Sequence, residues 1–484
     1  MDHTLPADSI AEFSVHSPAR QSTVPVLLAV SLVCACLLVE AAVLRVGVDD
    51  LDEGYFVQQA VRVLHGQVPY RDFATFYSPG LAYVHAVLFS ALGLLGPRAL
   101  ALAARGGLAL LLFIMTRPLV RQPLWAAAPG VFLLVGLDDA PVRWEPHPGW
   151  LSTFFAVLAA WCLSHGPSTR WLVLSGVAAG VAYAFKQNTG VLILAAIIAW
   201  GGFGLALGRD GLYRALIPTA AFGAVTLLWL VPLLVAVGGG LADLGVLVGA
   251  VDETGLFSPP EPALLIPVAC LGGGLWLVHR SADPRLRWYA LAGAALLLTE
   301  FPRMDTLHLA WSAPLLLVLG AAAVSRQRAV FAAVAVIAAL ALLAPTVTSR
   351  LAYVDLPRAP IDGVEAPSLT AADLQSVVAE VQQRTAAGEP IFVYPTSPLV
   401  YVLAERRNPT RFDHLNPGAA SPAQIQATMA DLTTAHVRLV VVSDYWRAVW
   451  GAPGANAALE SWLASTFREE VARHGPYRVL MSGL

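Results

Sequence analysis

The chain has 484 residues, of which 57% are hydrophobic and only 13% carry a charge. A soluble core cannot bury so much apolar surface, and the apolar runs repeatedly reach membrane-spanning length, so the composition indicates a polytopic membrane protein. The formal net charge of -3 and the thin spread of basic residues through the loops argue against a nucleic-acid partner. All four cysteines lie inside apolar segments, which is typical of small core residues and not of a disulfide framework or a zinc site.

The chain opens with a polar tail, residues 1–23, which is predicted to be cytoplasmic. The apolar segment after it is too long for a signal peptide and lacks a small-residue cleavage site, so it is predicted to be an anchor. Apolar periodicity and composition then predict an α-helical membrane domain over 24–346 with about 11–13 transmembrane helices. The spans are expected at about 24–46, 99–116, 124–137, 150–164, 171–185, 190–207, 215–237, 263–278, 287–300, 308–324 and 328–346.

The segment 79–95 decides the orientation of everything that follows it. It is apolar enough to span but contains Tyr83 and His85. If it does not span, the short inside loops hold ten arginines and the short outside loops hold only three basic residues, which is the positive-inside pattern. We therefore predict that 79–95 lies along or dips into the outer face, within an outer loop that covers 47–98.

A cluster of acidic residues follows the first apolar segment. Four carboxylates within five positions there offer a general base, or a metal or cation site, at the water interface. They are Asp49, Asp50, Asp52 and Glu53. A short amphipathic helix is predicted directly after them, so the alternative is that these acids only cap that helix and complement its dipole. Four acids are more than a cap needs, and we interpret the segment as the active-site loop.

The composition changes near residue 350, where a proline-rich linker leads into a polar helical pattern at 370–386. Short apolar runs at 390–394 and 438–442, with helix-like stretches between them, are typical of strands that alternate with helices. The sequence therefore predicts a small soluble α/β domain over 350–484, which the same orientation places outside the membrane.

Three motifs in the first outer loop resemble a known family. They are Asp52-Glu53 followed by Tyr55, then Gly66-Gln67-Val68-Pro69-Tyr70-Arg71-Asp72, then Tyr77-Ser78-Pro79-Gly80. In this order they resemble the polyprenyl-phosphate-sugar-dependent membrane glycosyltransferases of the GT-C class, which include protein O-mannosyltransferases and lipid A aminoarabinose transferases. The resemblance extends over roughly the first 200 residues and returns at 303–308.

This resemblance implies that an acidic residue of the loop deprotonates the acceptor hydroxyl, with Asp52 as the first candidate and Glu53 as the alternative. Asp49, Asp50 and Tyr55 are expected to bind substrate beside them. A lipid-linked sugar phosphate also needs cationic groups for the phosphate that leaves. The candidates for substrate binding of this kind are Arg105, Lys186, Arg303 and His308, with Asp305 beside the last. The alternatives are a structural ion pair for Arg105, snorkelling to headgroups for Lys186, and a loop-closing salt bridge at 303–308.

A second outer loop carries Asp138, Asp139, Arg143, Glu145 and His147, which could supply metal ligands together with the first. Oxygen ligands would favour Mg or Mn over Zn, and the requirement for a divalent metal is left open. A further set of aromatic residues is expected at the same level, where an interfacial belt is favoured over sugar stacking. These residues are Trp144, Trp150, Phe76, Tyr77 and Trp311.

The prediction for the whole chain is a glycosyltransferase that moves a sugar from a polyprenyl-phosphate carrier to a lipid, glycan or protein acceptor. It would act at the outer face of a bacterial inner membrane. The alternative is a polytopic transporter or lipid flippase, which predicts broken helices at the bilayer middle and symmetrical halves, and the sequence displays neither. A membrane-anchored scaffold would leave the acidic loop without a role.

Overall fold

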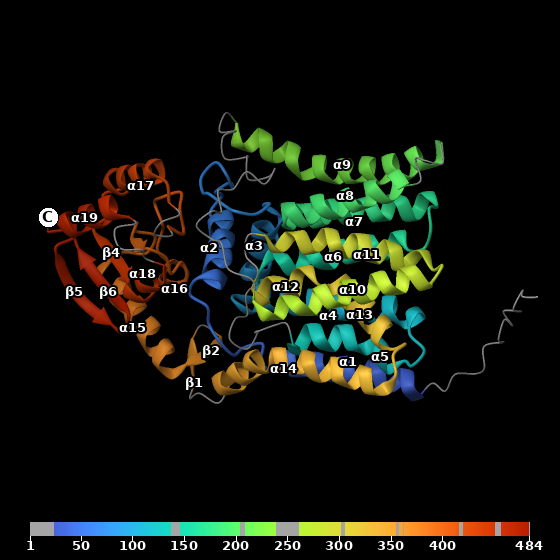
Figure 1. The fold of residues 1–484 in the computed structure, drawn as a ribbon. Coiled ribbons are helices and arrows are strands. Elements are labelled where there is room, and N and C mark those ends of the chain that lie inside the picture. Colours follow the sequence, from blue (N-terminus) through green and yellow to red (C-terminus); the bar gives the residue numbers. More distant parts are fainter. Residues whose placement is uncertain are drawn as a thin grey trace, which may run out of the picture.

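Parallel and antiparallel helices form a bundle, and a separate α/β domain lies at one of its ends in the computed structural model (Figure 1). The structure describes residues 24–136, 146–203, 209–238, 261–301, 305–354, 358–361, 363–415, 420–450 and 456–483. The helices along the bundle are α1 (Val24–Ala42), α4 (Leu95–Thr116), α5 (Leu124–Val131), α6 (Pro148–Leu163), α7 (Thr169–Phe185), α8 (Gln187–Phe203), α9 (Arg209–Val237), α10 (Leu265–Arg280), α11 (Pro284–Leu297), α13 (Pro314–Val324) and α14 (Ala329–Val354). They follow the predicted spans, and α14 continues past the predicted end at 346.

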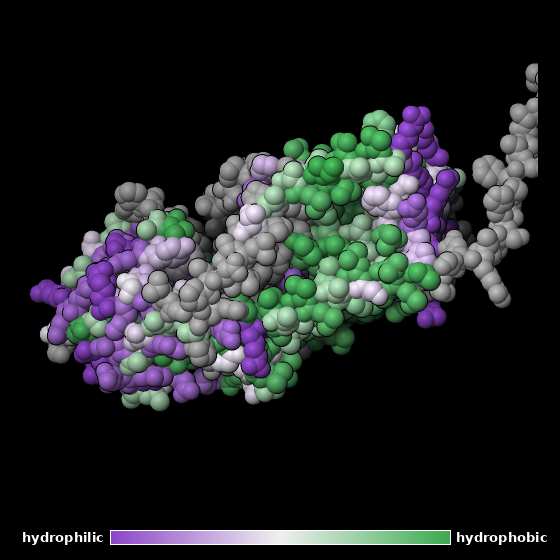
Figure 2. Space-filling view, turned by 90° about the horizontal axis from the view of Figure 1, so that it is seen from below, coloured by the Kyte–Doolittle hydropathy of each residue, from purple (hydrophilic) through white to green (hydrophobic). Residues whose placement is uncertain are grey.

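Four helical segments of the described chain are long and apolar enough to cross a membrane, and shorter apolar helices pack among them. The four are Val24–Ala42, Leu95–Leu119, Gly211–Val237 and Pro262–Arg280. On the face seen in Figure 2, hydrophobic residues form a band over the bundle, with hydrophilic residues at both ends. The predicted fold class, an α-helical polytopic membrane protein with a small C-terminal α/β domain, is confirmed.

Small residues allow the closest helix contacts in the bundle. Gly176 and Gly180 of α7 are four residues apart and face α9. A Cβ on Gly176 would lie 2.1 Å from the carbonyl oxygen of Pro218, and one on Gly180 would lie 2.9 Å from Cβ of Val225. Only glycine permits this approach, which follows the small-xxx-small pattern of membrane helices. The contact fixes α7, and with it the α7–α8 junction, against the long helix α9.

Two short helices, α2 (Asp52–Leu64) and α3 (Gly80–Leu92), lie at the end of the bundle that faces the α/β domain (Figure 1). The 13 residues of α3 extend about 20 Å, which is shorter than a bilayer's hydrocarbon core. It packs against α2 and α4. Because α5 and α13 of the bundle are shorter still, length does not separate α3 from the spans, and the expectation that 79–95 does not span stays a prediction.

The C-terminal domain begins with a hairpin of β1 (Arg358–Ile361) and β2 (Val364–Pro367). A four-stranded sheet follows in the order β3-β4-β6-β5, in which β3 pairs parallel to β4 and the other pairs are antiparallel. Its strands are β3 (Phe392–Tyr394), β4 (Leu439–Ser443), β5 (Glu469–His474) and β6 (Tyr477–Met481), and its helices are α15 (Ser368–Arg384), α16 (Leu399–Ala404), α17 (Pro422–Thr434), α18 (Asp444–Trp450) and α19 (Ala457–Thr466). The predicted helix at 370–386 and both predicted strands are confirmed.

The two parts of the molecule are joined through α2, which packs directly on α16. A Cβ on Gly54 would lie 2.6 Å from the amide nitrogen of Leu399, so the two backbones are in close contact. The buried Arg62 guanidinium bonds Asp413 from Nη2 at 2.7 Å and also donates to the carbonyl oxygen of Thr410. The helix that begins at the acidic loop is therefore held by both the bundle and the C-terminal domain.

Candidate active site

The acidic loop divides its four carboxylates among different environments. Asp49 lies three residues before α2, and its Oδ1 accepts hydrogen bonds from the amides of Leu51 at 2.9 Å and Asp52 at 3.2 Å. This is the capping role that short acidic side chains fill before a helix. The observed contacts of Asp49 therefore fit the alternative that this acid only caps the helix that follows.

Glu53 is fully buried and forms a two-pronged ion pair with Arg98. Arg98 Nε lies 2.5 Å from Oε1 of Glu53, and Nη2 lies 2.7 Å from Oε2. The same guanidinium donates to the carbonyl oxygens of Leu44 and Gly47. A carboxylate held by two bonds to a buried arginine is enclosed and already paired, so it cannot readily reach a substrate hydroxyl.

Asp50 points to the C-terminal domain. Its Oδ2 accepts from the Tyr477 hydroxyl at 2.7 Å and from the Ser397 hydroxyl, and Trp446 Nε1 donates to the carboxylate at 3.2 Å. All three donors come from residues more than 300 positions away in the sequence. Asp50 thus anchors the domain to the start of α2.

Asp52 is the remaining acid of the loop, and it is partly exposed in the first turn of α2. Among the described residues its carboxylate has no hydrogen-bond or ion-pair partner. The helix dipole favours the ionised form there. Asp52 and Phe56 are one turn apart and share a helix face, and the Phe56 ring lies 5.3 Å from His147 and 5.8 Å from Tyr77. Asp52 therefore projects on the side of α2 where these residues gather.

An aromatic cluster lies on this side, with Trp311 at its centre. His147 stacks on Trp311 with ring centroids 3.8 Å apart and planes 2° apart. Nδ1 of His147 accepts from the amide of Gly149 at 2.9 Å, so its Nε2–H donates to the Tyr77 hydroxyl at 3.0 Å. Gly149 leaves room for Trp311, because a Cβ there would lie 2.5 Å from the indole.

Lys186 reaches the same tryptophan from the junction between α7 and α8. It is 6% exposed, and its Nζ lies 5.0 Å from the Trp311 ring centroid, a cation–π contact. The next residue, Gln187, holds the loop after Phe76: it accepts from the amide of Ser78 at 3.2 Å and donates to the carbonyl oxygen of Phe76 at 2.8 Å. The Tyr77-Ser78-Pro79-Gly80 motif and Lys186 are thereby brought together.

The pair Asp305 and His308 forms a third side of the cluster. Asp305 caps α12 (Thr306–Ser312), since its Oδ1 accepts from the amide of His308 at 3.0 Å. The same oxygen accepts from Nδ1 of His308 at 2.7 Å, which orients the imidazole. The His308 ring lies 5.0 Å from Trp311. His147, Lys186 and His308 therefore come from three separate regions of the chain to one indole.

Two buried donors in this cluster lack a partner in the part of the chain that the structure describes. They are Nε1 of Trp311 and the hydroxyl of Ser78, both in side chains at most 2% exposed. A buried polar group without a partner is destabilising unless a ligand or water satisfies it. Together with the Lys186 ammonium they favour an anionic group, because all of them can donate and Lys186 adds positive charge.

Other predicted site residues lie apart from this cluster. Arg105 pairs with Glu40 at 2.5 Å and lies over Trp150, so it forms the structural ion pair that the sequence allowed as its alternative. Tyr55 is buried, with its hydroxyl accepting from the amide of Phe76, and burial raises its pKa above the usual range. Arg303 and the acids Asp138, Asp139 and Glu145 lie outside the described residues.

The prediction that Trp150 and Trp311 belong to an interfacial belt is wrong, because they are 3% and 2% exposed and lie in the core of the bundle. Phe76, in contrast, is 41% exposed. Aromatic residues near a helix end can face either lipid or a neighbouring helix. The sequence pattern could not distinguish these two cases.

The role of Arg98 was not predicted from the sequence, and His147 was predicted only as a possible metal ligand. An arginine four positions into α4 could have been matched to an acid of the loop, because an unpaired charge there would be costly. No sequence signal selects Glu53 over Asp52 as its partner. Within the described residues, no group of three or more His, Cys, Asp or Glu side chains could hold a metal ion.

No protein-family model matches this sequence, and a search of the curated proteins found no match. Similar solved structures do exist. ArnT from Cupriavidus metallidurans bound to undecaprenyl phosphate has a TM-score of 0.61 at 14% identity, covering 95% of this chain and 98% of that chain. The apo oligosaccharyltransferase of Archaeoglobus fulgidus has a TM-score of 0.56 at 12% identity, covering 87% of this chain and 71% of that chain.

The same archaeal enzyme, AglB in complex with an inhibitory peptide and a dolichol-phosphate, matches with a TM-score of 0.56 at 14% identity, covering 88% of this chain and 71% of that chain. At these identities the similarity concerns the fold. The predicted resemblance to GT-C membrane glycosyltransferases is confirmed at that level.

Proposed function

We propose that this chain is a membrane glycosyltransferase that transfers a sugar from a polyprenyl-phosphate carrier to an acceptor hydroxyl, with Asp52 as the general base. One observation supports the proposal: of the four acids in the loop, only Asp52 has a carboxylate without a partner among the described residues, and it shares a face of α2 with Phe56, whose ring contacts His147 and Tyr77 of the cluster around Trp311. The fold is that of proteins whose structures hold undecaprenyl phosphate and dolichol-phosphate, which supports a lipid phosphate as the carrier.

The reaction requires one proton transfer and one substitution at the sugar. Asp52 accepts the proton of the acceptor hydroxyl as its oxygen bonds to the anomeric carbon. The bond from that carbon to the phosphate oxygen breaks, and the lipid phosphate leaves with the electron pair. Lys186, the Trp311 Nε1–H and the Ser78 hydroxyl stabilise the negative charge on the leaving phosphate. His308, oriented by Asp305, lies beside them as a further donor.

The described residues do not provide a ligand set for a divalent metal. Glu53, Asp50 and Asp305 are each committed to a protein partner, which leaves Asp52 as the free carboxylate of the described site. One structure of the archaeal oligosaccharyltransferase is described as a complex with Zn and sulfate. No step of the proposed reaction depends on a metal. Measuring sugar transfer at increasing Mg or Mn concentration would test for metal dependence.

The acceptor is a hydroxyl on a lipid, a glycan or a protein, and the site is proposed to open to the outer face of a bacterial inner membrane. The positive-inside distribution of the loop arginines supports this side. The C-terminal domain lies at the same end as Asp52 and would border the path of the acceptor.

The test is sugar transfer from a polyprenyl-phosphate sugar in proteoliposomes. Asp52→Asn should reduce turnover by about 10²–10⁴-fold, because the amide keeps the size of the side chain but cannot accept the proton. Glu469→Gln, which changes an exposed carboxylate of the C-terminal domain, is the control and should leave turnover within about twofold. Unchanged turnover in Asp52→Asn would remove Asp52 from the mechanism.

The same assay at limiting donor examines the phosphate site. Lys186→Met should raise the donor concentration for half-maximal rate by about tenfold or more, because one charge-assisted contact is lost. Arg71→Gln is the matched control, since Arg71 is an exposed cation that pairs with Asp72 near the same end. Equal effects of the two substitutions would mean that Lys186 has no special place in donor binding.

A further inference from the structure

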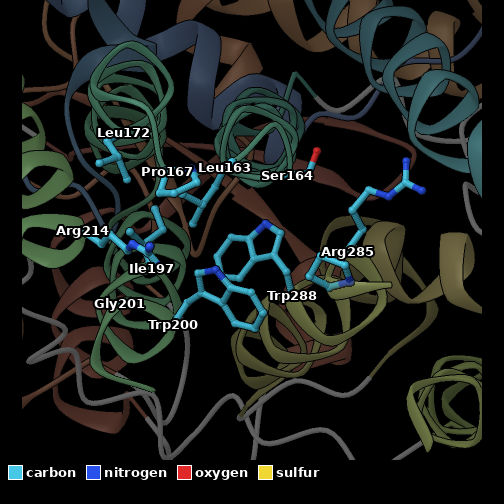
Figure 3. Close-up of a pocket in the computed structure, with 12 residues that line it drawn as sticks. Leu163, Ser164, Pro167, Leu172, Ile197, Trp200, Gly201, Arg214, Arg285 and Trp288 are labelled. Carbon is cyan, nitrogen blue, oxygen red and sulfur yellow. The ribbon is translucent and has the colours of Figure 1, made fainter. Parts of the chain in front are cut away.

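A second candidate site lies at the opposite end of the bundle from Asp52. It is a partly open cavity of about 200 Å³ between the ends of five helices (Figure 3). It is lined by Leu163, Ser164, Gly166, Pro167, Leu172, Ile197, Trp200, Gly201, Arg214, Pro284, Arg285 and Trp288. Lys186 precedes α8 and Gly201 lies near its end, so the cavity is about 20–25 Å from the proposed active site along the helix axis. The two sites are therefore separate.

Two indoles form the apolar wall of the cavity. The Trp200 and Trp288 rings lie 5.7 Å apart, side by side in the middle of the lining (Figure 3). Nε1 of Trp288 donates to the carbonyl oxygen of Ala160 at 2.8 Å, which fixes that indole. Ile197 and Leu172 are buried beside them. This wall suits aliphatic or glycerol-like groups, and it presents no carboxylate to repel an anion.

The two arginines of the lining differ in their contacts. Arg285 is held by Asp283 at 2.6 Å, and its guanidinium points away from the indoles (Figure 3). Arg214 lies at the other side of the lining, and among the described residues it has no ion-pair or hydrogen-bond partner. Arg214 can therefore offer its planar fork of donors to a phosphate.

The size and surroundings of the cavity indicate what would fill it. A volume of about 200 Å³ is smaller than the pockets of roughly 300–1,000 Å³ that enclose whole small ligands. The occupant should therefore insert only part of itself and leave the rest outside. Next to Arg214, Leu212 and Leu216 of α9 are 50% and 55% exposed, an apolar surface suited to acyl chains. The arginines of the neighbouring loops would attract an anionic membrane surface.

We propose that this cavity binds the headgroup of an anionic phospholipid from the leaflet at this end of the bundle, which is the predicted cytoplasmic side. Arg214 binds the phosphate, the Trp200 and Trp288 indoles pack against the glycerol and first methylenes, and the acyl chains lie along α9. This inference concerns a site apart from the proposed transferase chemistry and does not depend on it.

The experiment measures lipid retention by the full-length protein in detergent, using native mass spectrometry. Phosphatidylglycerol is the probe, phosphatidylcholine the neutral comparison and inorganic phosphate the soluble competitor. We expect Arg214→Gln to weaken phosphatidylglycerol retention by about tenfold, as the loss of a charge-assisted phosphate contact predicts. Arg328→Gln removes an exposed positive charge from the same end, outside the cavity, and should change retention less than about twofold.

Three results would overturn the proposal. Equal weakening by Arg214→Gln and Arg328→Gln would mean that the attraction is diffuse, and equal retention of the two lipids by the unaltered protein would mean that it is absent. Displacement of the lipid by millimolar inorganic phosphate would assign the cavity to a free anion. Trp288→Phe is a second variant, used because Arg214→Gln could disturb packing. It keeps an aromatic ring but removes the indole. We expect it to weaken retention of both lipids and to preserve the preference for phosphatidylglycerol.

Discussion

The two ends of the helical bundle differ in how their charged side chains are buried and paired. At the end that carries the C-terminal domain, two buried ion pairs join residues distant in sequence: Glu53 with Arg98, and Arg62 with Asp413. At the opposite end, Arg285 pairs with Asp283, two positions away, and Arg328 is exposed. Local, solvated pairs contribute little to stability, whereas a buried pair is strongly destabilising when one partner is removed.

The difference shows which charges have structural tasks. Buried pairs at the first end hold α2, which carries Asp52 in its first turn, against both the bundle and the C-terminal domain. Replacing Arg285 or the exposed Arg328 at the other end should lower the free energy of unfolding only slightly, because neither belongs to a buried ion pair.

The first prediction concerns the side of the membrane that each end faces. In a background without the four native cysteines, Ala372→Cys should react with an impermeant thiol reagent in intact cells, because it is exposed on the C-terminal domain. Gln327→Cys, exposed at the other end, should react only after permeabilisation. The opposite pattern would reverse the orientation and place the acidic loop in the cytoplasm.

The second prediction concerns the buried pair at α2. Glu53→Gln should lower the free energy of unfolding by about 3–5 kcal/mol, because the Arg98 guanidinium is left buried without its carboxylate. Thermal unfolding in detergent measures the change, and Asp283→Asn at the other end should lose less than about 1 kcal/mol. The double variant with Arg98→Met should recover part of the loss. Additive losses in the double variant would mean that the two residues act independently.

The third prediction concerns the link between the loop and the C-terminal domain. Asp50→Asn keeps the side-chain shape but weakens the bonds to Tyr477 and Trp446, and it should destabilise domain docking by about 1–3 kcal/mol. Limited proteolysis at the linker near residue 355 should become faster, while unfolding of the bundle should change little. Asp444→Asn, which alters surface pairs of the same domain, is the control. Equal proteolysis of the two variants would argue that Asp50 does not anchor the domain.

Much of the architecture could be predicted from the sequence. Long apolar runs predicted the bundle because each span must satisfy its own backbone hydrogen bonds in lipid, a constraint that is local to each segment. Local periodicity likewise predicted the helix at 370–386 and the strands at 390–394 and 438–442. The motifs around Asp52-Glu53 and Tyr77-Ser78-Pro79-Gly80 indicated the fold class, and the similar solved structures confirm it.

The roles within the acidic loop could not be predicted in this way. Asp49, Asp50, Asp52 and Glu53 are chemically alike and close in sequence, and three of them are distinguished by a partner: Asp49 by the amides of Leu51 and Asp52, Asp50 by Tyr477, and Glu53 by Arg98. Two of these partners lie 45 and 427 positions away, at distances over which sequence spacing carries no geometric information. The sequence by itself determined that a carboxylate would stand at this helix start. Only the tertiary structure, by pairing its neighbours, left Asp52 as the one available among the described acids of the loop.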